Sequence, residues 1–315
     1  MPRRGAKITV VGVGAVGACV AYTLATGGLA TELALIDADH RRAEGQAMDL
    51  GDAVAYLRPV HIYASDYADS AGSSIVIFTA GAPRAPGQSR LDLARQNLAI
   101  LKETFPRVLR YSPDAIFLIV TNPVDIITYA ATRLADMGDE RVLGTGTVLD
   151  TSRFRRLLSR HVRVDPRNVH AYVVGEHGDS LLALWSRVSV AGYGLDEYCR
   201  EMGLPPVDRQ EILAQVTRAG AEIITRKGAT QFGVSIAVAR IVEAILRNER
   251  SVLTVSGLVE GVYGAEGPNC FSLPSLVDGG GRRRTLLLDL APDELEALKR
   301  SAGLLKEIHK EVGLA

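Results

Sequence analysis

A histidine flanked by two glycines is the residue of this sequence best suited to acid–base chemistry. His177 stands in the segment Gly175-Glu176-His177-Gly178-Asp179-Ser180, where its small neighbours leave the ring free to face a cleft. Histidine titrates near neutral pH, and a buried carboxylate beside it would orient the ring and support its protonated form. Asp150 is the candidate partner. A histidine in a surface turn and an aspartate that only caps a helix are the open alternatives.

Three arginines could recognise an anionic substrate. Arg153 follows Asp150 by three residues in an expected helix, and its planar guanidinium could hold a carboxylate through two parallel hydrogen bonds. Arg84 and Arg90 belong to residues 81–90, a loop with prolines and glycines after a buried strand, and such a loop can act as a mobile lid. Taken alone, either of these two arginines is better explained as a solvated surface residue.

A glycine motif near the start of the chain predicts a dinucleotide site. In Gly12-Val13-Gly14-Ala15-Val16-Gly17, the first glycine permits a tight turn, the second a close approach of backbone to a pyrophosphate, and the third close packing of helix on strand. Val16 lies in the same turn. Asp37 follows 20 residues after Gly17, where a carboxylate would accept hydrogen bonds from the adenosine ribose and repel a 2′-phosphate. NAD is therefore the expected cofactor, although nearby arginines at 41 and 42 keep NADP open.

Composition excludes several classes of function. Of 315 residues, 47% are hydrophobic and 23% charged, with 36 basic against 36 acidic side chains, so no basic field attracts nucleic acid or anionic membrane. Cys19, Cys199 and Cys270 lie far apart and in no C-x-x-C spacing, which predicts neither disulfides nor a zinc site and fits a reducing cytoplasm. The uncharged stretch 8–31 could pass for a signal peptide or membrane span, but its glycines favour strand, turn and helix.

The order of the expected elements predicts an α/β fold of two associated domains. Short β-branched runs alternate with helical segments in the first half, as in a doubly wound parallel sheet of the Rossmann type. We expect a dinucleotide-binding domain over 1–145 and an α+β substrate-binding, catalytic domain over 146–315. Residues 282–284, three arginines, are expected in a solvated turn. The expected strands are 6–11, 32–37, 59–64, 74–79, 115–120, 141–145, 168–174, 252–259, 269–277 and 284–288. The expected helices of the second domain include 150–160, one opening at Asp208, and 235–248.

Ordered segments along the whole chain resemble the lactate/malate dehydrogenase family. They are residues 11–17, 79–93, 121–125, 149–155, 175–180 and 227–230. The resemblance implies a small 2-oxo or 2-hydroxy acid as substrate, NAD as cofactor, no metal, and a cytoplasmic homotetramer or homodimer. By position it makes His177 the proton donor to the substrate carbonyl, Asp150 its partner, Arg153 the carboxylate clamp and Arg90 the lid arginine that polarises the carbonyl.

Four more residues take roles through this resemblance. Asn122 resembles the residue that orients substrate beside the nicotinamide, and Thr230 one that lines the pocket. Arg155 and His170 resemble the anion-binding pair of bacterial lactate dehydrogenases that fructose 1,6-bisphosphate activates at a subunit interface. An ordinary interface arginine and histidine is the alternative for this pair.

Arg84 decides the expected substrate. Malate dehydrogenases carry arginine at this lid position, where lactate dehydrogenases typically carry glutamine, and a guanidinium closed over the methyl group of pyruvate would lose water without gaining a partner. We therefore expect an NAD-dependent malate dehydrogenase of the tricarboxylic acid cycle on a lactate-dehydrogenase-like scaffold. L-lactate dehydrogenase is the alternative, and a non-catalytic dinucleotide-binding redox sensor is a distant one. No tyrosine has a lysine four residues later, which disfavours a short-chain dehydrogenase.

Overall fold

A nine-stranded sheet runs through the molecule, and its first six strands are parallel. The computed structural model describes residues 5–83, 87–265 and 267–314. Within them the parallel strands lie in the order β3-β2-β1-β4-β5-β6, the Rossmann order expected from the sequence. Their bounds are β1 (Lys7–Val11), β2 (Glu32–Ile36), β3 (His61–Ala64), β4 (Ile75–Phe78), β5 (Ile116–Ile119) and β6 (Val142–Gly144).

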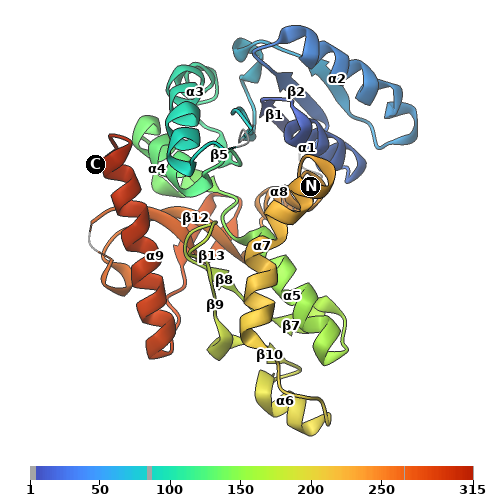
Figure 1. Cartoon of the computed structure of the whole chain (residues 1–315). Helices are drawn as coiled ribbons and strands as arrows, with labels where there is room; N and C mark the ends of the chain where they lie inside the picture. Colours follow the sequence, from blue (N-terminus) through green and yellow to red (C-terminus); the bar gives the residue numbers. More distant parts are fainter. Residues whose placement is uncertain (1–4, 84–86, 266, 315) are drawn as a thin grey trace.

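Alternate residues of the central strands face two separate apolar cores, as the period of a strand requires. On β4, Val76 and Phe78 pack with helices α3 (Arg90–Tyr111), α4 (Val124–Ala135) and α9 (Pro292–Glu311). Ile75 and Ile77 face the opposite core, with α1 (Ala15–Thr26), α2 (His40–Asp52) and α8 (Phe232–Leu246). Helices on both faces bury the sheet, which explains why β4 and β5 are continuous apolar runs (Figure 1).

The second half of the chain extends the same sheet with antiparallel strands. β12 (Ser251–Val259) pairs with β6 through Ser256 and Gly144, and β13 (Asn269–Asp278) and β14 (Gly281–Thr285) follow in order. A third core is formed mainly by α5 (Val148–Val162) and the small strands around it. The remaining elements are β7 (Val169–His170), β8 (Val173–Val174), β9 (Leu182–Ala183), β10 (Ser189–Val190), β11 (Tyr193–Gly194), α6 (Leu195–Glu201) and α7 (Arg209–Lys227). Short 3-10 helices span Val54–Tyr56, Tyr67–Ser70, Asp139–Arg141, Pro166–Asn168, Trp185–Arg187 and Val262–Gly264.

Two predictions about the second half are wrong in detail. The single strand expected over 168–174 is two short strands, because β7 pairs with β10 whereas β8 pairs with β9. The last strand is β14, which begins at Gly281 and therefore takes in the three arginines expected in a solvated turn. Arg282 is buried, since Gly257 below it has no Cβ to occupy its place.

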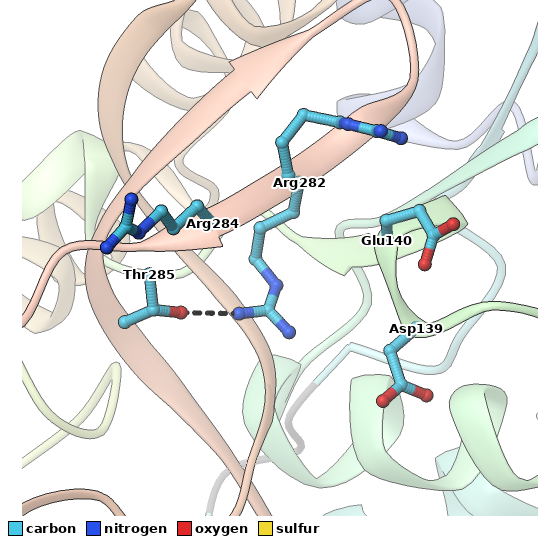
Figure 2. Close-up of a pocket in the computed structure, with 6 residues that line it drawn as sticks. Asp139, Glu140, Arg282, Arg284 and Thr285 are labelled. Atoms are coloured by element: carbon cyan, nitrogen blue, oxygen red, sulfur yellow. Dashed lines mark hydrogen bonds between the residues drawn. The ribbon is translucent and has the colours of Figure 1, made fainter.

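The two terminal nitrogens of the Arg282 guanidinium bond to uncharged groups, whereas its buried Nε has no hydrogen-bond partner among the described residues. Arg282 donates to Thr285 Oγ1 over 2.7 Å and to the Leu258 carbonyl, and it lines a pocket of about 300 Å³ with Asp139 and Glu140 (Figure 2).

Asp208 begins α7 as expected, because it caps the helix by accepting from the Glu211 backbone over 3.0 Å. Among the described residues, no helix has the length and apolar character that a membrane span requires.

Candidate active site

The segments singled out for chemistry meet at the carboxyl ends of the parallel strands. The glycine turn follows β1, Arg90 begins α3 after the loop that leaves β4, and Asn122 lies between β5 and α4. Asp150 stands on the first turn of α5, which follows β6. This edge is where ligands bind in doubly wound α/β proteins.

The glycine turn has the geometry of a phosphate cradle. Gly12 adopts φ 91°, and a Cβ there would lie 2.5 Å from the backbone of Ala80. A Cβ on Gly17 would overlap the carbonyl oxygen of Gly12, whereas one on Gly14 would meet open space. Gly14 is the N-cap of α1 and provides no side-chain acceptor, so the first N–H groups of the helix are left for a ligand. The residues present therefore fit a dinucleotide.

Asp37 supports the same turn from the end of β2. Its Oδ2 accepts from the Val13 backbone over 2.8 Å and its Oδ1 from the Asp39 backbone over 3.0 Å. Arg42 lies 3.4 Å from Asp37 and 3.8 Å from Asp39, so its charge is already balanced and is a poor candidate for holding a 2′-phosphate. Oδ1 of Asp37 accepts from both Asp39 and Arg42, whereas Oδ2 accepts only from Val13 among the described residues and retains an acceptor site for a ribose hydroxyl. Val16 is partly buried against the core behind the turn.

His177, Asp150 and Arg153 form one hydrogen-bonded row. The Nδ1 atom of His177 lies 2.5 Å from Asp150 Oδ2, and Arg153 Nη1 donates to Asp150 Oδ1 over 2.9 Å. Asp150 is almost fully buried, whereas the His177 side chain is 25% exposed. Thr147 is the N-cap of α5, so the alternative reading of Asp150 as a helix cap is wrong. The structure thus joins three predicted residues whose sequence spacing could only suggest their proximity.

The row changes the acidity of both members of the pair. Burial by itself would lower the pKa of His177, but the charge and hydrogen bond of Asp150 outweigh it and raise the pKa above its ordinary value. Burial would likewise raise the pKa of Asp150, but His177 and then Arg153 hold it below its usual range. With Nδ1 engaged, Nε2 is the nitrogen of His177 left to exchange a proton with a ligand.

A second carboxylate contacts His177 and was given no role from the sequence. Asp125, on the first turn of α4, accepts from the His177 backbone N–H over 2.7 Å through Oδ2 and from Ser256 over 2.6 Å through Oδ1. Its burial raises its pKa to about 6. The sequence did offer a signal for a buried carboxylate, because Asp125 stands between the apolar residues Val124 and Ile126.

Arg90 is held by the loop that carries His177. It is the first residue of α3, and its guanidinium lies 2.7 Å from the Glu176 carboxylate and donates to the His177 carbonyl over 3.0 Å. Gly178 makes room for it, because a Cβ there would overlap the guanidinium. Arg84, the residue from which the substrate was predicted, lies outside the described residues.

Asn122 and Thr230 lie in connecting segments near these elements. The Asn122 carbonyl accepts from Asn97 Nδ2 over 2.7 Å, and Asn97 Oδ1 accepts from the Ala82 backbone over 2.7 Å. Asn97, buried on α3, thereby links the start of the lid loop to the turn after β5, a role that the sequence analysis missed. Thr230 lies half-buried between α7 and α8, and no hydrogen bond among the described residues joins it to His177.

The two expected effector residues lie close together, because Arg155 contacts the residue that follows His170. Arg155 Nε donates to the Ala171 carbonyl over 3.0 Å, and its guanidinium lies 5.6 Å from the Tyr172 ring. Burial lowers the pKa of Arg155. His170 is exposed and lines a pocket of about 360 Å³ that also includes Asn168 and Tyr198.

Comparison with known proteins gives full-length matches. Two family models match, the lactate/malate dehydrogenase NAD binding domain over 6–144 and the lactate/malate dehydrogenase alpha/beta C-terminal domain over 147–313. The L-lactate dehydrogenase of Moorella thermoacetica is 49% identical over 311 residues, and that of Acetivibrio thermocellus 47% over 310, each match covering 98% of both chains.

Solved structures give the same result. A lactate dehydrogenase from a Medee basin deep-sea metagenome superposes with a TM-score of 0.95 at 36% identity, covering 98% of this chain and 99% of the other. The minor L-lactate dehydrogenase of Enterococcus mundtii gives 0.93 at 40% identity, covering 98% of each.

These matches correct the predicted substrate and confirm the cofactor. The expectation of a malate dehydrogenase of the tricarboxylic acid cycle is wrong, because the full-length relatives are named L-lactate dehydrogenases, the alternative that the sequence left open. That expectation depended on one lid arginine. Its guanidinium loses hydration free energy only if the closed loop buries it, so an arginine at this position does not by itself exclude pyruvate. The first domain binds NAD, as its family does. The chain belongs to the lactate/malate dehydrogenase family.

Proposed function

We propose that the protein is an NAD-dependent L-lactate dehydrogenase, which interconverts pyruvate and L-lactate. The observation that carries the proposal is the buried row of His177, Asp150 and Arg153, which places a proton donor and an anion-binding group side by side. The names of the full-length relatives support this substrate among the small 2-oxo acids.

In the proposed reaction, NADH supplies the hydride when bound, and this chain positions the acid and handles the proton. As the carbonyl carbon receives the hydride pair, its oxygen takes the proton from Nε2 of His177, which leaves the imidazole neutral. Asp150 stabilises the protonated ring before transfer. In the reverse direction, neutral His177 accepts the hydroxyl proton of L-lactate, so oxidation is favoured at higher pH and reduction at lower pH.

Two arginines complete the proposed substrate site. Arg153 uses one N–H on Asp150 and keeps further donors of its guanidinium for the substrate carboxylate. Arg90 supplies positive charge where the carbonyl oxygen becomes negative. We further assign Asn122 to orientation of the substrate beside the nicotinamide and Thr230 to the pocket wall.

The proposed NAD contacts come from the turn after β1 and its neighbours. Gly12, Gly14, Val16 and Gly17 form the pyrophosphate turn, and Asp37 accepts hydrogen bonds from the ribose. Asn122 contacts the cofactor as well as the substrate. We keep the division into an NAD-binding domain over 1–145 and a catalytic domain over 146–315 as part of this proposal, although one sheet crosses the boundary through β6 and β12.

The decisive experiment measures NADH oxidation at 340 nm with pyruvate and, separately, with oxaloacetate. We expect the higher kcat/KM with pyruvate, and a preference for oxaloacetate would overturn the proposal. His177→Asn should abolish turnover while NADH fluorescence still reports binding. Unchanged turnover in that variant would overturn the role of His177 as proton donor, whereas an unaltered protein that binds NADH but turns over neither substrate would be a non-catalytic redox sensor.

We also propose that the protein acts as a homodimer or homotetramer in the cytoplasm. Large apolar side chains lie exposed on α2 and the short helix after it (Met48, Tyr56) and on α7 and α8 (Ile224, Phe232, Ile236). A second copy would remove this surface from water. Its three cysteines are free thiols, as in reducing compartments. Sedimentation velocity tests the assembly, and a monomer at micromolar concentration would contradict it.

Arg155 and His170 are the proposed site for an anionic effector. Ala171, which accepts from Arg155, directly follows His170, and two-fold symmetry at an interface would double this cationic pair. Titration with fructose 1,6-bisphosphate at pH 6 to 7 tests the assignment. If neither the KM for pyruvate nor the oligomer size changes, the two residues are not an effector site.

A further inference from the structure

We propose that Asp125 is a positioning residue for the catalytic histidine, which fixes the backbone of His177 and supports the protonated form of its ring. The inference depends on the proposed function, because it assigns Asp125 a part in the proton transfer by His177. Asp125 does not touch the reacting atoms and acts through His177.

The carboxylate of Asp125 joins three separate parts of the fold at one point. It stands on α4, accepts from Ser256 of β12, and accepts from the His177 backbone N–H in the loop after β8, with the two hydrogen bonds on different oxygens. His177 therefore has an acidic residue on either side, Asp150 at its ring and Asp125 at its main chain. Two attachments fix both the place and the direction of the imidazole.

Asp125 is 1% exposed, and no arginine or lysine in the described part of the chain is its direct partner or forms an ion pair with it. Of the charged groups around it, His177 lowers its pKa and Glu176 raises it. The buried thiol of Cys270 on the neighbouring strand is also within its electrostatic reach. Protonated His177 is thus the charge that Asp125 can stabilise, and its carboxylate in turn raises the pKa of His177.

Asp125→Asn isolates the charge from the hydrogen bonds. The asparagine oxygen can still accept from the His177 backbone, while its amide donates to Ser256 Oγ, because a hydroxyl both donates and accepts. If Asp125 supports imidazolium, removing its charge should lower the pKa of His177 with little change in packing.

The pKa of His177 can be measured without turnover. Diethyl pyrocarbonate modifies neutral imidazole, so its rate of reaction at His177, followed by peptide mass spectrometry from pH 5 to 9, gives the midpoint. We expect Asp125→Asn to lower this midpoint by about half to one pH unit, a three- to tenfold loss of proton affinity. The alkaline limit of pyruvate reduction should shift by the same amount.

Ser256→Ala provides a milder second variant. It keeps the contact of Asp125 with His177 but removes a hydrogen bond that favours the ionised carboxylate, so more Asp125 is protonated near neutral pH and the His177 midpoint falls in the same direction. Ser275→Ala is the matched control, since Ser275 is also buried and its hydroxyl, among the described residues, donates to the Leu273 carbonyl and not to Asp125.

The outcomes separate the inference from the proposed function. A midpoint unchanged in a folded Asp125→Asn protein overturns the inference, as does a fall in kcat with no shift of the pH limit, which indicates a merely structural role. Equal shifts in Ser256→Ala and Ser275→Ala also overturn it. If the unaltered protein fails to reduce pyruvate, the proposed function fails, whereas the modification midpoint still tests Asp125.

Discussion

Arg90 is ion-paired with the buried carboxylate of Glu176, 2.7 Å away, on the loop that carries His177. The Glu176 side chain is 4% exposed and that of Arg90 30% exposed. The other carboxylate oxygen of Glu176 accepts from the Ser180 hydroxyl. Arg90 is therefore the cation that pairs with Glu176 among the described residues. The arginine proposed to act on substrate therefore also has a structural role, as the cation beside a buried carboxylate.

Replacing Arg90 should affect stability and catalysis by separable routes. Arg90→Met leaves Glu176 as a buried carboxylate without its cation, which we expect to lower the free energy of unfolding by about 1–3 kcal/mol. Turnover should fall about 100- to 1000-fold, because positive charge at the developing oxyanion is lost. Urea unfolding and steady-state rates measure the two effects.

The double variant Arg90→Met/Glu176→Gln separates them. Removing the carboxylate charge as well should restore most of the lost stability but none of the lost turnover. Recovery of activity in the double variant would show that Arg90 matters only as the partner of Glu176.

Asp150→Asn should change the pH dependence of the reaction. Asp150 raises the pKa of His177, so the histidine stays protonated to higher pH than an isolated imidazole. Without that charge, the alkaline limit of pyruvate reduction should move to lower pH, and kcat should fall by about 100- to 10,000-fold as the ring loses its orienting partner. Asp165→Asn, at an exposed aspartate paired with Arg167, is the control. An unshifted limit would contradict the role given to Asp150.

Gly14→Ala and Gly17→Ala should behave oppositely. A Cβ at Gly14 meets open space, so the folded chain tolerates it, but it occupies the place of the proposed pyrophosphate, and NADH affinity should fall about tenfold, roughly 1.4 kcal/mol. A Cβ at Gly17 overlaps the Gly12 carbonyl, so this change should lower Tm. Fluorescence titration and thermal unfolding compare them. Normal NADH affinity in Gly14→Ala would exclude the cradle.

The sequence predicted the parallel sheet well because each strand carries its own signal. Ile75 to Phe78 and Ile116 to Ile119 are short apolar runs buried on both faces, and such runs can be recognised from the local sequence alone. The break between β7 and β8 had no such signal, since it depends on which strand each one meets. Arg282 was misjudged for a similar reason, because its burial depends on Gly257, which lies 25 residues earlier.

The site shows the same division between local and distant information. Asp150 and Arg153 share a helix, so their proximity follows from their spacing, and the glycines around His177 singled out that histidine before the family resemblance gave it a role. The contact between Asp125 and His177 spans 52 residues, and that between Arg90 and the His177 carbonyl spans 87. Neither could be read from spacing, because only the assembled sheet brings α3, α4 and the loop after β8 together.

His309 should make the protein sensitive to acid. It lies buried on α9, its ring stacked on Tyr129 at 4.2 Å between centroids, and Nε2 has no hydrogen-bond partner among the described residues. Burial lowers its pKa to about 4. Because an unfolded histidine binds its proton near pH 6.5, stability is fully present above that pH and is lost as pH falls toward 4, by as much as about 3 kcal/mol.

His309→Phe should remove that loss. Phenylalanine keeps an aromatic ring against Tyr129 and cannot titrate, so the free energy of unfolding should exceed that of the unaltered chain at pH 5 by more than it does at pH 7.5. Urea unfolding at both pH values measures the difference, and His40→Phe, at an exposed histidine, is the control. The same dependence on pH in the His309→Phe protein and the unaltered chain would mean that other groups, the buried carboxylates among them, govern unfolding in acid.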